Sequence, residues 1–422
     1  MTGPAVPAGP PPRPPMEGVL RCRAHSDLMK RDVSGKGLST RCVHAGEQSD
    51  PATGAVGTPI FQNTTYLFPN PDRPVPKGAR HGDYYIYTRF NNPTIEALEA
   101  KVAAIEGAEA AVALASGMAA ISTVALTYCK AGGHIVSAKD LYGGTFTLMN
   151  DYFPSLGIRT TLVDTRDVDA FRKAIRPDTK LLYVESITNP VLKVADVPAL
   201  AKVAHDAGVP LVVDATFATP VNQSPLELGA DVVVHSGTKY LGGHSDVTAG
   251  VVAGKRAFCY DLRDRMINWG GCMDPSAAWL LMRGIKTLEV RVQRQNATAL
   301  RLARFLEGHP KVSRAIYPFL DGHPDHELAK RVLRGGGGML TFELPALEAC
   351  RKFLGGLEVA YVAASLGGVD SLVTLPLDTT HKGLDAAARA SLGIADGCVR
   401  MSVGIEDPDD LEADLARGLE KV

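Results

Sequence analysis

The chain has 422 residues, and its 45 lysines and arginines against 46 aspartates and glutamates leave a formal net charge of −1. This balance argues against a general nucleic-acid binder, because phosphate contacts need an excess of basic residues. No apolar run approaches the roughly 18 residues of a membrane-spanning helix, and the 42 glycines and 28 prolines exclude a coiled coil. Seven cysteines without a CxxC pair indicate reduced thiols and predict a cytoplasmic protein.

Composition divides the chain into four segments. Residues 1–38 are rich in proline and then basic, which predicts a disordered extension. Residues 39–80 contain many turn residues and few periodic segments, so we expect an arm that lies on another surface. Strand-like and helix-like segments then alternate in a predicted large domain at 81–285, and residues 286–422 form a predicted smaller C-terminal domain.

The first regular element predicted along the chain is a helix that Asn92 can cap, that Pro93 suits as its first residue and that Gly107 ends. Seven short apolar runs predict strands: Ala111–Ala115, Ile135–Ala138, Thr160–Asp164, Lys180–Glu185, Pro210–Asp214, Asp231–His235 and Gly250–Ala253. Helical patterns separate several of them: Met118–Thr127, Val168–Ile175 and Val197–Asp206. Apolar strands alternating with helices predict an α/β domain whose mostly parallel, seven-stranded sheet is covered on both faces.

The smaller domain begins with a long helical pattern over Ile285–Leu306. A predicted strand at Met339–Leu344, a helix at Leu347–Leu354 and a strand at Val399–Gly404 follow. This order predicts a second α/β unit with a core of its own.

Ligands bind beyond the carboxyl ends of the strands in an open parallel sheet. Two predicted strands of the large domain end in residues that can bind a charged ligand. The first strand runs into Ser116, Gly117 and Met118, a small-residue turn that opens a helix whose N-terminus can hold an anion. Such turns also precede helices that bind nothing. The fifth strand ends in Asp214, whose carboxylate can serve a ligand or simply bond the backbone.

The sixth strand is followed by Ser236, Thr238 and Lys239. A lysine just beyond a buried strand can be desolvated enough to act as a neutral amine, although a solvated surface lysine would show the same pattern. Together, an anion cradle, a carboxylate and a strand-end lysine meet the needs of pyridoxal 5′-phosphate (PLP). The lysine forms a Schiff base with it, the carboxylate keeps its ring nitrogen protonated, and hydroxyls and amides hold its phosphate.

Further segments extend this pattern in order along the chain: Tyr87-Thr88-Arg89, Asn92-Pro93-Thr94, Leu141-Tyr142-Gly143-Gly144-Thr145, Asn189-Pro190, Gly243-His244-Ser245-Asp246, Ser365-Leu366-Gly367-Gly368 and Arg400-Met401-Ser402-Val403-Gly404. In these segments the sequence resembles the Cys/Met-metabolism (trans-sulfuration) family of PLP-dependent enzymes. That family includes cystathionine γ-lyase, cystathionine γ-synthase, methionine γ-lyase and the homoserine sulfhydrylases. The resemblance runs from about Thr40 to the C-terminus.

The resemblance implies the PLP-dependent transferase fold of type I and a homotetramer built from two active dimers. Lys239 would carry the cofactor, Asp214 would pair with its ring nitrogen, and Tyr142 would stack on its ring and help remove a proton from the substrate amino group. Two subunits would hold the phosphate together. One subunit would contribute Gly117, Met118, Ser236 and Thr238, and its neighbour would contribute Tyr87 and Arg89.

The resemblance also implies a substrate site and the absence of a metal. Arg400 would bind the substrate carboxylate as a bidentate fork, with Ser365 and Asn189 assisting. Glu185 is expected one layer behind the residues that contact the ligands. The segment His323-Pro324-Asp325-His326 has no matched set of metal ligands elsewhere, so we interpret it as a loop.

Three positions that bear on the substrate match no single subfamily. Relatives that handle cystathionine often carry an acid at the position of Ile86 and a glutamate at that of Ala364, and methionine γ-lyases typically carry a cysteine at that of Gly144. The rim of the pocket is therefore predicted to be apolar and poorly suited to a charged distal group.

The leading hypothesis is γ-elimination by a C–S lyase, which converts a cystathionine-, methionine- or homocysteine-type amino acid into a 2-oxo acid, ammonia and a thiol. The alternative is γ-replacement, in which a thiol or another nucleophile is added to an O-acyl-homoserine-type substrate. A nucleotide-binding oxidoreductase would need a GxGxxG turn after a strand, and the sequence has none. A binding protein without catalytic activity would hold no cofactor on Lys239.

Overall fold

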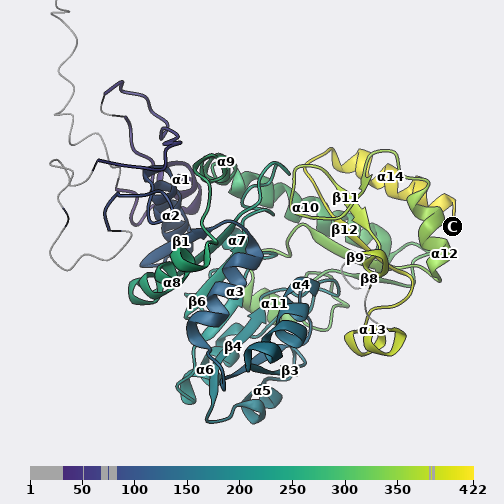
Figure 1. The fold of residues 1–422 in the computed structure, drawn as a ribbon. Coiled ribbons are helices and arrows are strands. Elements are labelled where there is room, and N and C mark those ends of the chain that lie inside the picture. The colour runs from purple at the N-terminus through teal and green to yellow at the C-terminus, as the bar shows by residue number, and fades with distance from the viewer. Residues whose placement is uncertain (1–31, 51, 68–74, 76–82, 380–381, 383–384) are drawn as a thin grey trace, which may run out of the picture.

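The computed structural model describes residues 32–50, 52–67, 75, 83–379, 382 and 385–422. The predicted extension at 1–38 lies for the most part outside these residues, as does a portion of the predicted arm at 39–80. The described part of the arm contains α1 (Leu38–His44) and then turns and bends until α2 begins. Figure 1 shows α1 and α2 (Pro93–Glu106) at one end of the molecule and α14 (Pro408–Glu420) at the other.

A seven-stranded sheet forms the centre of the larger unit, in the strand order β1-β7-β6-β5-β4-β2-β3. The central strands pair in parallel, while β7 runs antiparallel to both β1 and β6. The seven predicted strands are confirmed, with each end shifted by at most one residue: β1 (Ala110–Leu114), β2 (His134–Ala138), β3 (Arg159–Val163), β4 (Thr179–Glu185), β5 (Leu211–Asp214), β6 (Val232–Ser236) and β7 (Gly250–Gly254). The predicted α/β fold with a mostly parallel sheet is confirmed.

Helices cover both faces of this sheet because successive residues of a strand point to opposite sides. Val112 of β1 belongs to the core under α3, α5, α6 and α8, whereas Ala111 and Ala113 belong to the core under α2 and α9. The helices of the larger unit are α2 (Pro93–Glu106), α3 (Gly117–Tyr128), α4 (Gly143–Thr147), α5 (Val168–Ala174), α6 (Val197–Asp206), α7 (Thr219–Asn222), α8 (Arg256–Trp269) and α9 (Pro275–Ile285).

Local signals decide where two of the predicted helices begin and end. The Asn92 side chain accepts the Thr94 N–H at 2.9 Å, and Gly107 ends α2 with a φ of 67°, as predicted. The helix predicted over Ile285–Leu306 is wrong at its start, because Ile285 ends α9 and α10 begins only at Leu288. A tight turn between them, closed by the Thr287 N–H on the Gly284 carbonyl at 3.3 Å, redirects the chain.

The C-terminal part of the chain has a sheet of its own, in the order β10-β11-β12-β9-β8. Its strands are β8 (Arg314–Ile316), β9 (Met339–Glu343), β10 (Tyr361–Val362), β11 (Leu372–Thr374) and β12 (Cys398–Ser402). Its helices are α10 (Leu288–Glu307), α11 (His326–Val332), α12 (Leu347–Leu354), α13 (Ala386–Leu392) and α14 (Pro408–Glu420). A separate core joins this sheet to α10, α12 and α14. The start of α10 packs in a core of the larger unit, and Figure 1 shows the helix between α9 and the C-terminal sheet. None of the helices in the described ranges combines the length and apolarity needed to cross a membrane.

Candidate active site

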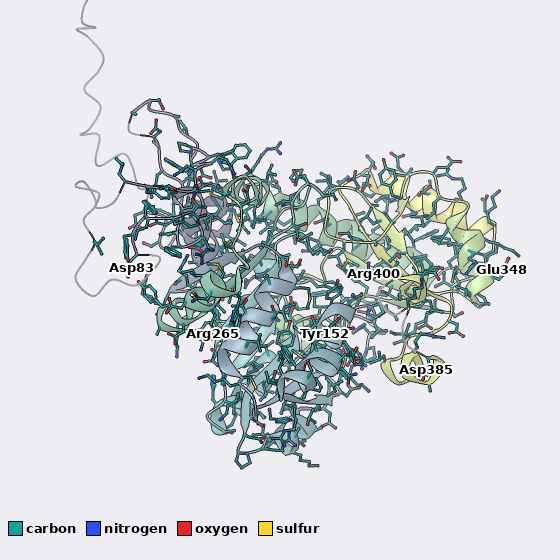
Figure 2. All side chains as sticks on the ribbon, viewed as in Figure 1. Asp83, Tyr152, Arg265, Glu348, Asp385 and Arg400 are labelled. Carbon is teal, nitrogen blue, oxygen red and sulfur yellow. The ribbon has the colours of Figure 1, made fainter. Side chains whose placement is uncertain are left out.

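The carboxyl ends of β4, β5 and β6 border a cavity of about 970 Å³, to which the C-terminal unit also contributes. Ten of the twelve site residues named from the sequence line it: Gly117, Met118, Tyr142, Asn189, Asp214, Ser236, Thr238, Lys239, Ser365 and Arg400. Figure 2 labels Arg400, from β12, and Tyr152, from the helical turn that follows α4, and both side chains line this cavity.

Lys239 and Ser365 form the first pair in the cavity. The Lys239 Nζ donates to Ser365 Oγ at 2.9 Å. Burial, and then the positive charge of Arg400, lowers the pKa of Lys239 below its ordinary value. Ser365 has a φ of 89°, in the region that only glycine adopts readily, and such a conformation costs about 1–3 kcal/mol. The site therefore holds a strained serine against a lysine that loses its proton more easily than a solvated one.

Arg400 forms the second anchor, and it is only 2% exposed. Its Nη1 donates to Asn189 Oδ1 at 3.0 Å and its Nη2 to the Ser365 carbonyl at 3.1 Å. Its buried Nε has no hydrogen-bond partner within the described chain. Burial lowers the pKa of Arg400 to about 10, which still leaves the guanidinium charged at neutral pH. A buried cation with a spare donor is suited to an anionic ligand.

Two carboxyl groups stand at the ends of neighbouring strands. Asp214 accepts the Tyr183 hydroxyl at 3.2 Å and the Thr216 N–H at 2.9 Å. Glu185 pairs with Asp214 in the β4–β5 register and accepts the Tyr142 N–H at 2.6 Å. Burial, and then the Asp214 charge, raises the pKa of Glu185 well above its ordinary value. Glu185 therefore holds a proton more tightly than a solvated glutamate does, while Asp214 is held in place by two donors.

The N-terminus of α3 forms an anion cradle beside the end of β6. Ser116 caps the helix by accepting the Ala119 N–H at 3.1 Å, so Gly117 and Met118 occupy the first turn, where N–H groups have no partner within the helix. A Cβ on Gly117 would lie 2.8 Å from Ser236 Oγ. Only glycine therefore keeps this cradle open, and the cradle, the Asp214 carboxylate and the Lys239 amine together fit PLP.

Tyr142 directly precedes α4, at its N-cap position, and is 45% exposed. A Cβ on Gly144 would lie 2.6 Å from the Tyr142 ring at Cε1 and 3.2 Å from Met118 Sδ. The glycine therefore permits the position that the tyrosine ring occupies. A cysteine at this position would require the ring to move.

Tyr87 and Arg89 are the two named residues that the structure does not bring to this cavity. The Arg89 Nη1 donates to the Ile267 carbonyl at 2.7 Å, at the end of α8. Its guanidinium lies 5.9 Å from the centre of the Tyr87 ring and 5.0 Å from that of Phe90. Within one chain they form a cluster of their own on the arm side of the molecule.

The sequence patterns did not reveal several of the residues at this site, and four of them bear on its chemistry. Tyr183 and Thr216 bond Asp214, and Thr379 and Lys382 line the cavity. The position of Tyr183 two residues before the end of β4 was a signal for Tyr183, and the position of Thr216 two residues after β5 was a signal for Thr216. Nothing local marked Thr379 or Lys382, which come from a segment far along the chain.

The His323-Pro324-Asp325-His326 segment makes protein contacts. His323 Nδ1 accepts the Asp325 N–H at 3.1 Å, and the Asp325 carboxylate binds Arg166 through two nitrogens, at 2.7 and 2.8 Å. Across the described ranges, no three His, Cys, Asp or Glu side chains gather as a metal ion would require.

Comparison with known proteins identifies the family. A family model described as Cys/Met metabolism PLP-dependent enzyme matches residues 39–420. The chain is 45% identical over 384 residues to a cystathionine gamma-lyase of Bacillus subtilis, covering 91% of this chain and 99% of the relative. It is 41% identical to a chloroplastic cystathionine gamma-synthase of Arabidopsis thaliana, covering 90% of this chain and 68% of the relative. The crystal structure of cystathionine gamma-lyase from Lactobacillus plantarum complexed with L-serine matches with a TM-score of 0.86 at 39% identity, covering 92% of this chain and 99% of that one. The chain therefore belongs to the Cys/Met-metabolism family of PLP-dependent enzymes and is a trans-sulfuration enzyme, lyase or synthase.

Proposed function

We propose that this enzyme catalyses γ-elimination from a sulfur amino acid whose distal group is neutral. An amino acid RS–CH₂–CH₂–CH(NH₃⁺)–COO⁻ and one water give a thiol RSH, ammonium and 2-oxobutanoate. One C–S bond and one C–N bond break, and the water supplies the keto oxygen. The family match leaves no support for the nucleotide-binding oxidoreductase.

The observation that carries this proposal is the distribution of charge in the cavity. Glu185 and Asp214 are the only carboxyl residues among its described lining, and both stand at strand ends. Elsewhere the lining includes the apolar side chains of Ile187, Phe217 and Leu366. A distal ammonium would find no acid to pair with there, and an unpaired buried ion costs several kcal/mol. A thioether needs no such partner.

The cofactor would be held by residues already described. Lys239 would carry it, Asp214 would face its ring nitrogen, and the α3 N-terminus with Ser236 and Thr238 would hold its phosphate. When bound, PLP supplies an electron sink that stabilises negative charge on the substrate Cα. The strained Ser365 keeps the Lys239 amine in a defined position, because its Oγ accepts a hydrogen bond from the Lys239 Nζ.

The protein's own groups then bind the amino acid and move its protons. Arg400 would bind the carboxylate, with Asn189 and Ser365 holding the guanidinium in place. Lys239 would take the proton from Cα, give that proton up again and then, as a neutral amine, take one from Cβ. A lysine with a lowered pKa is more often in this neutral form at neutral pH. The Tyr142 hydroxyl would help remove a proton from the incoming amino group.

The proposal includes a homotetramer of two active dimers. Tyr87 and Arg89 would reach the phosphate in the cavity of a second copy. Exposed apolar side chains on the arm support such a contact, since Leu67 is 83% and Val56 77% exposed. Mixing inactive Lys239→Ala subunits with weak Arg89→Ala subunits tests this point. Mixed dimers would contain one intact site and regain activity, whereas self-sufficient subunits would not.

One residue favours γ-replacement as a second candidate function. Lys382 lines the cavity, and its ammonium suits an acidic leaving group such as the succinyl ester of an activated homoserine. A thiol would then take the place of that group on the γ-carbon.

Incubation with L-methionine, L-cystathionine and O-acetyl-L-homoserine, each with and without a thiol, separates the two functions. Formation of 2-oxobutanoate without an added thiol would establish the lyase. A new thioether formed only in the presence of the thiol would establish the synthase. Turnover of none of the three would reject both functions.

A separate test concerns the cofactor. The purified protein should be yellow, and borohydride should fix the cofactor on Lys239.

A further inference from the structure

A buried loop joins β4 to α6 and carries Asn189, the residue that contacts Arg400. The loop closes on itself, because the Thr188 N–H donates to the Lys193 carbonyl at 2.9 Å and the Lys193 N–H to Thr188 Oγ1 at 3.1 Å. All of its residues from 186 to 195 are buried. Polar groups in a buried loop need partners, and a charged lysine needs them most.

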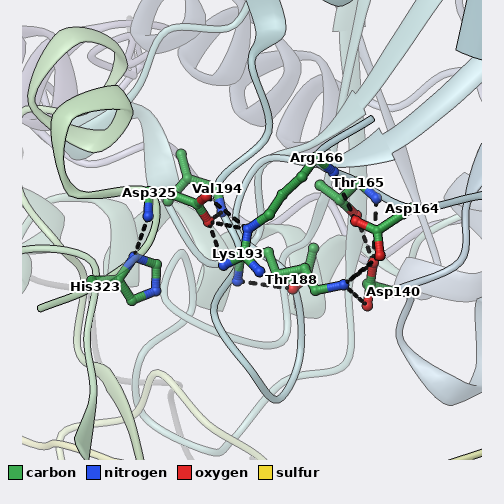
Figure 3. Close-up of polar contacts among 9 residues, drawn as sticks. All are labelled: Asp140, Asp164, Thr165, Arg166, Thr188, Lys193, Val194, His323 and Asp325. Atoms are coloured by element: carbon green, nitrogen blue, oxygen red, sulfur yellow. Dashed lines mark hydrogen bonds and ion pairs between the residues drawn. The ribbon is translucent and has the colours of Figure 1, made fainter. Parts of the chain in front are cut away.

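Lys193 finds its partners on two other loops (Figure 3). Its Nζ lies 2.8 Å from Asp140 Oδ1 and 3.0 Å from Asp164 Oδ2, and its side chain is only 8% exposed. Asp140 precedes Tyr142 by two residues, and Asp164 directly follows β3. The Thr165 hydroxyl donates to the same Asp140 carboxylate at 3.0 Å. One buried ammonium therefore connects the Asn189 loop with the loop that presents Tyr142.

The far side of the Asn189 loop is tied to the C-terminal unit. The Val194 N–H donates to Asp325 Oδ2 at 3.1 Å, and Arg166 holds that carboxylate (Figure 3). The Thr341 hydroxyl of β9 donates to the Pro190 carbonyl at 2.6 Å. On the opposite side, the Lys193 ammonium connects the loop to Asp140, two residues before Tyr142.

We propose that Lys193 is a positioning residue for amino-acid binding. Its ammonium sets the separation of the Asn189 and Tyr142 loops, and Asn189 in turn orients the Arg400 guanidinium. Without that ammonium, Asp140 loses its cation and faces the Asp164 carboxylate, so the two loops separate. The inference rests on the proposed function, in which Arg400 binds the substrate carboxylate.

Calorimetric binding of glycine to the PLP-loaded enzyme tests this role. Glycine has the amino and carboxylate groups of a substrate but no γ-carbon to react. Lys193→Met should raise the Kd for glycine roughly tenfold, since small displacements of binding groups are costly. Asn189→Ala should also raise this Kd. The Kd of the double variant should be no higher than that of the more affected single variant, because both substitutions act on the contact between Asn189 and Arg400.

Lys139→Met is the matched control. The Lys139 Nζ lies 3.1 Å from the same Asp164 carboxylate, so its removal also takes a cation from Asp164 but leaves the Lys193–Asp140 contact in place. Its Kd for glycine should stay within about twofold of the wild-type value. If Lys193→Met does not fold, Asp164→Asn replaces it. Asp164→Asn should raise the Kd for glycine by a smaller factor, and it should cause no further rise when Asn189→Ala is already present.

Two outcomes would overturn the proposal: unchanged glycine binding in the folded Lys193→Met or Asp164→Asn variant, or additive losses in the double variant. Lys193 would then stabilise the fold without positioning Arg400. Failure of the wild-type enzyme to bind glycine would instead reject the proposed function, and this inference with it. The wild-type measurement therefore separates the two failures.

Discussion

The two ends of the cavity are built in opposite ways. Where the strands end, the carboxyl groups have partners within the chain: Asp214 is bonded by Tyr183 and Thr216, and Glu185 by the Tyr142 N–H. Elsewhere the described wall has apolar side chains and hydroxyls but no carboxyl group, and Lys382 adds an exposed ammonium. The first arrangement suits a ligand that must be held in one geometry, because fixed dipoles need no reorganisation during a reaction. The second leaves the choice of substrate to the few charges that the wall contains.

The largest expected effect comes from the cofactor end. Lys239→Ala should lower kcat by at least ~10³-fold, because it removes both the covalent anchor and the base. Turnover with saturating PLP measures the loss, and borohydride should no longer fix the cofactor to the chain. Near-normal turnover by Lys239→Ala would mean that the strand-end part of the cavity is not where the cofactor is held.

Arg400→Lys should have the next largest effect, on the group that joins the two ends. Lysine cannot reproduce a bidentate fork, and loss of a buried charged contact costs at least 2 kcal/mol. We expect KM for the amino acid to rise roughly 30- to 100-fold, with a smaller change in kcat. Arg351→Lys, at an exposed position on α12, is the matched control and should leave KM unchanged. A fall in kcat alone would contradict the binding role.

Lys382→Ala tests the distal end and should have a modest, selective effect. An exposed ion pair is worth about 0.2–1 kcal/mol, so kcat/KM for O-succinyl-L-homoserine should fall about two- to fivefold. The value for L-methionine, which has no distal anion, should not change. Equal losses for both compounds would mean that Lys382 does not select the distal group.

The pH dependence of cofactor uptake gives the smallest effect. A lowered pKa means that the Lys239 amine is deprotonated at a lower pH than an ordinary lysine. The rate at which the apoenzyme takes up PLP should therefore rise with pH, with a midpoint below 10.5. Arg400→Gln should shift this midpoint upward, because the Arg400 charge contributes to the lowering. A stopped-flow absorbance series measures both enzymes, and a midpoint that does not move would show that burial acts alone.

Much of the fold followed from local patterns. The strands β1 to β7 were predicted from short apolar runs, and α2 from the Asn92 cap and the Gly107 end. The motif at Ser236 to Lys239 marked a strand end, and strand ends of a parallel sheet converge on one edge. The helices α8 and α14 were not predicted, because each has a short apolar face among many charged residues; that face packs against one of the cores.

The sequence by itself determined the family, the sheet and most of the residues that line the cavity, because their side chains are marked by motifs and by apolar neighbours. Only the tertiary structure decided which distant groups meet there. Tyr183 reaches Asp214, Lys382 lines the cavity, and Lys193 joins Asp140 to Asp164. These contacts depend on how separate loops pack, and hydrogen bonds or ion pairs between loops leave no periodic pattern in either segment.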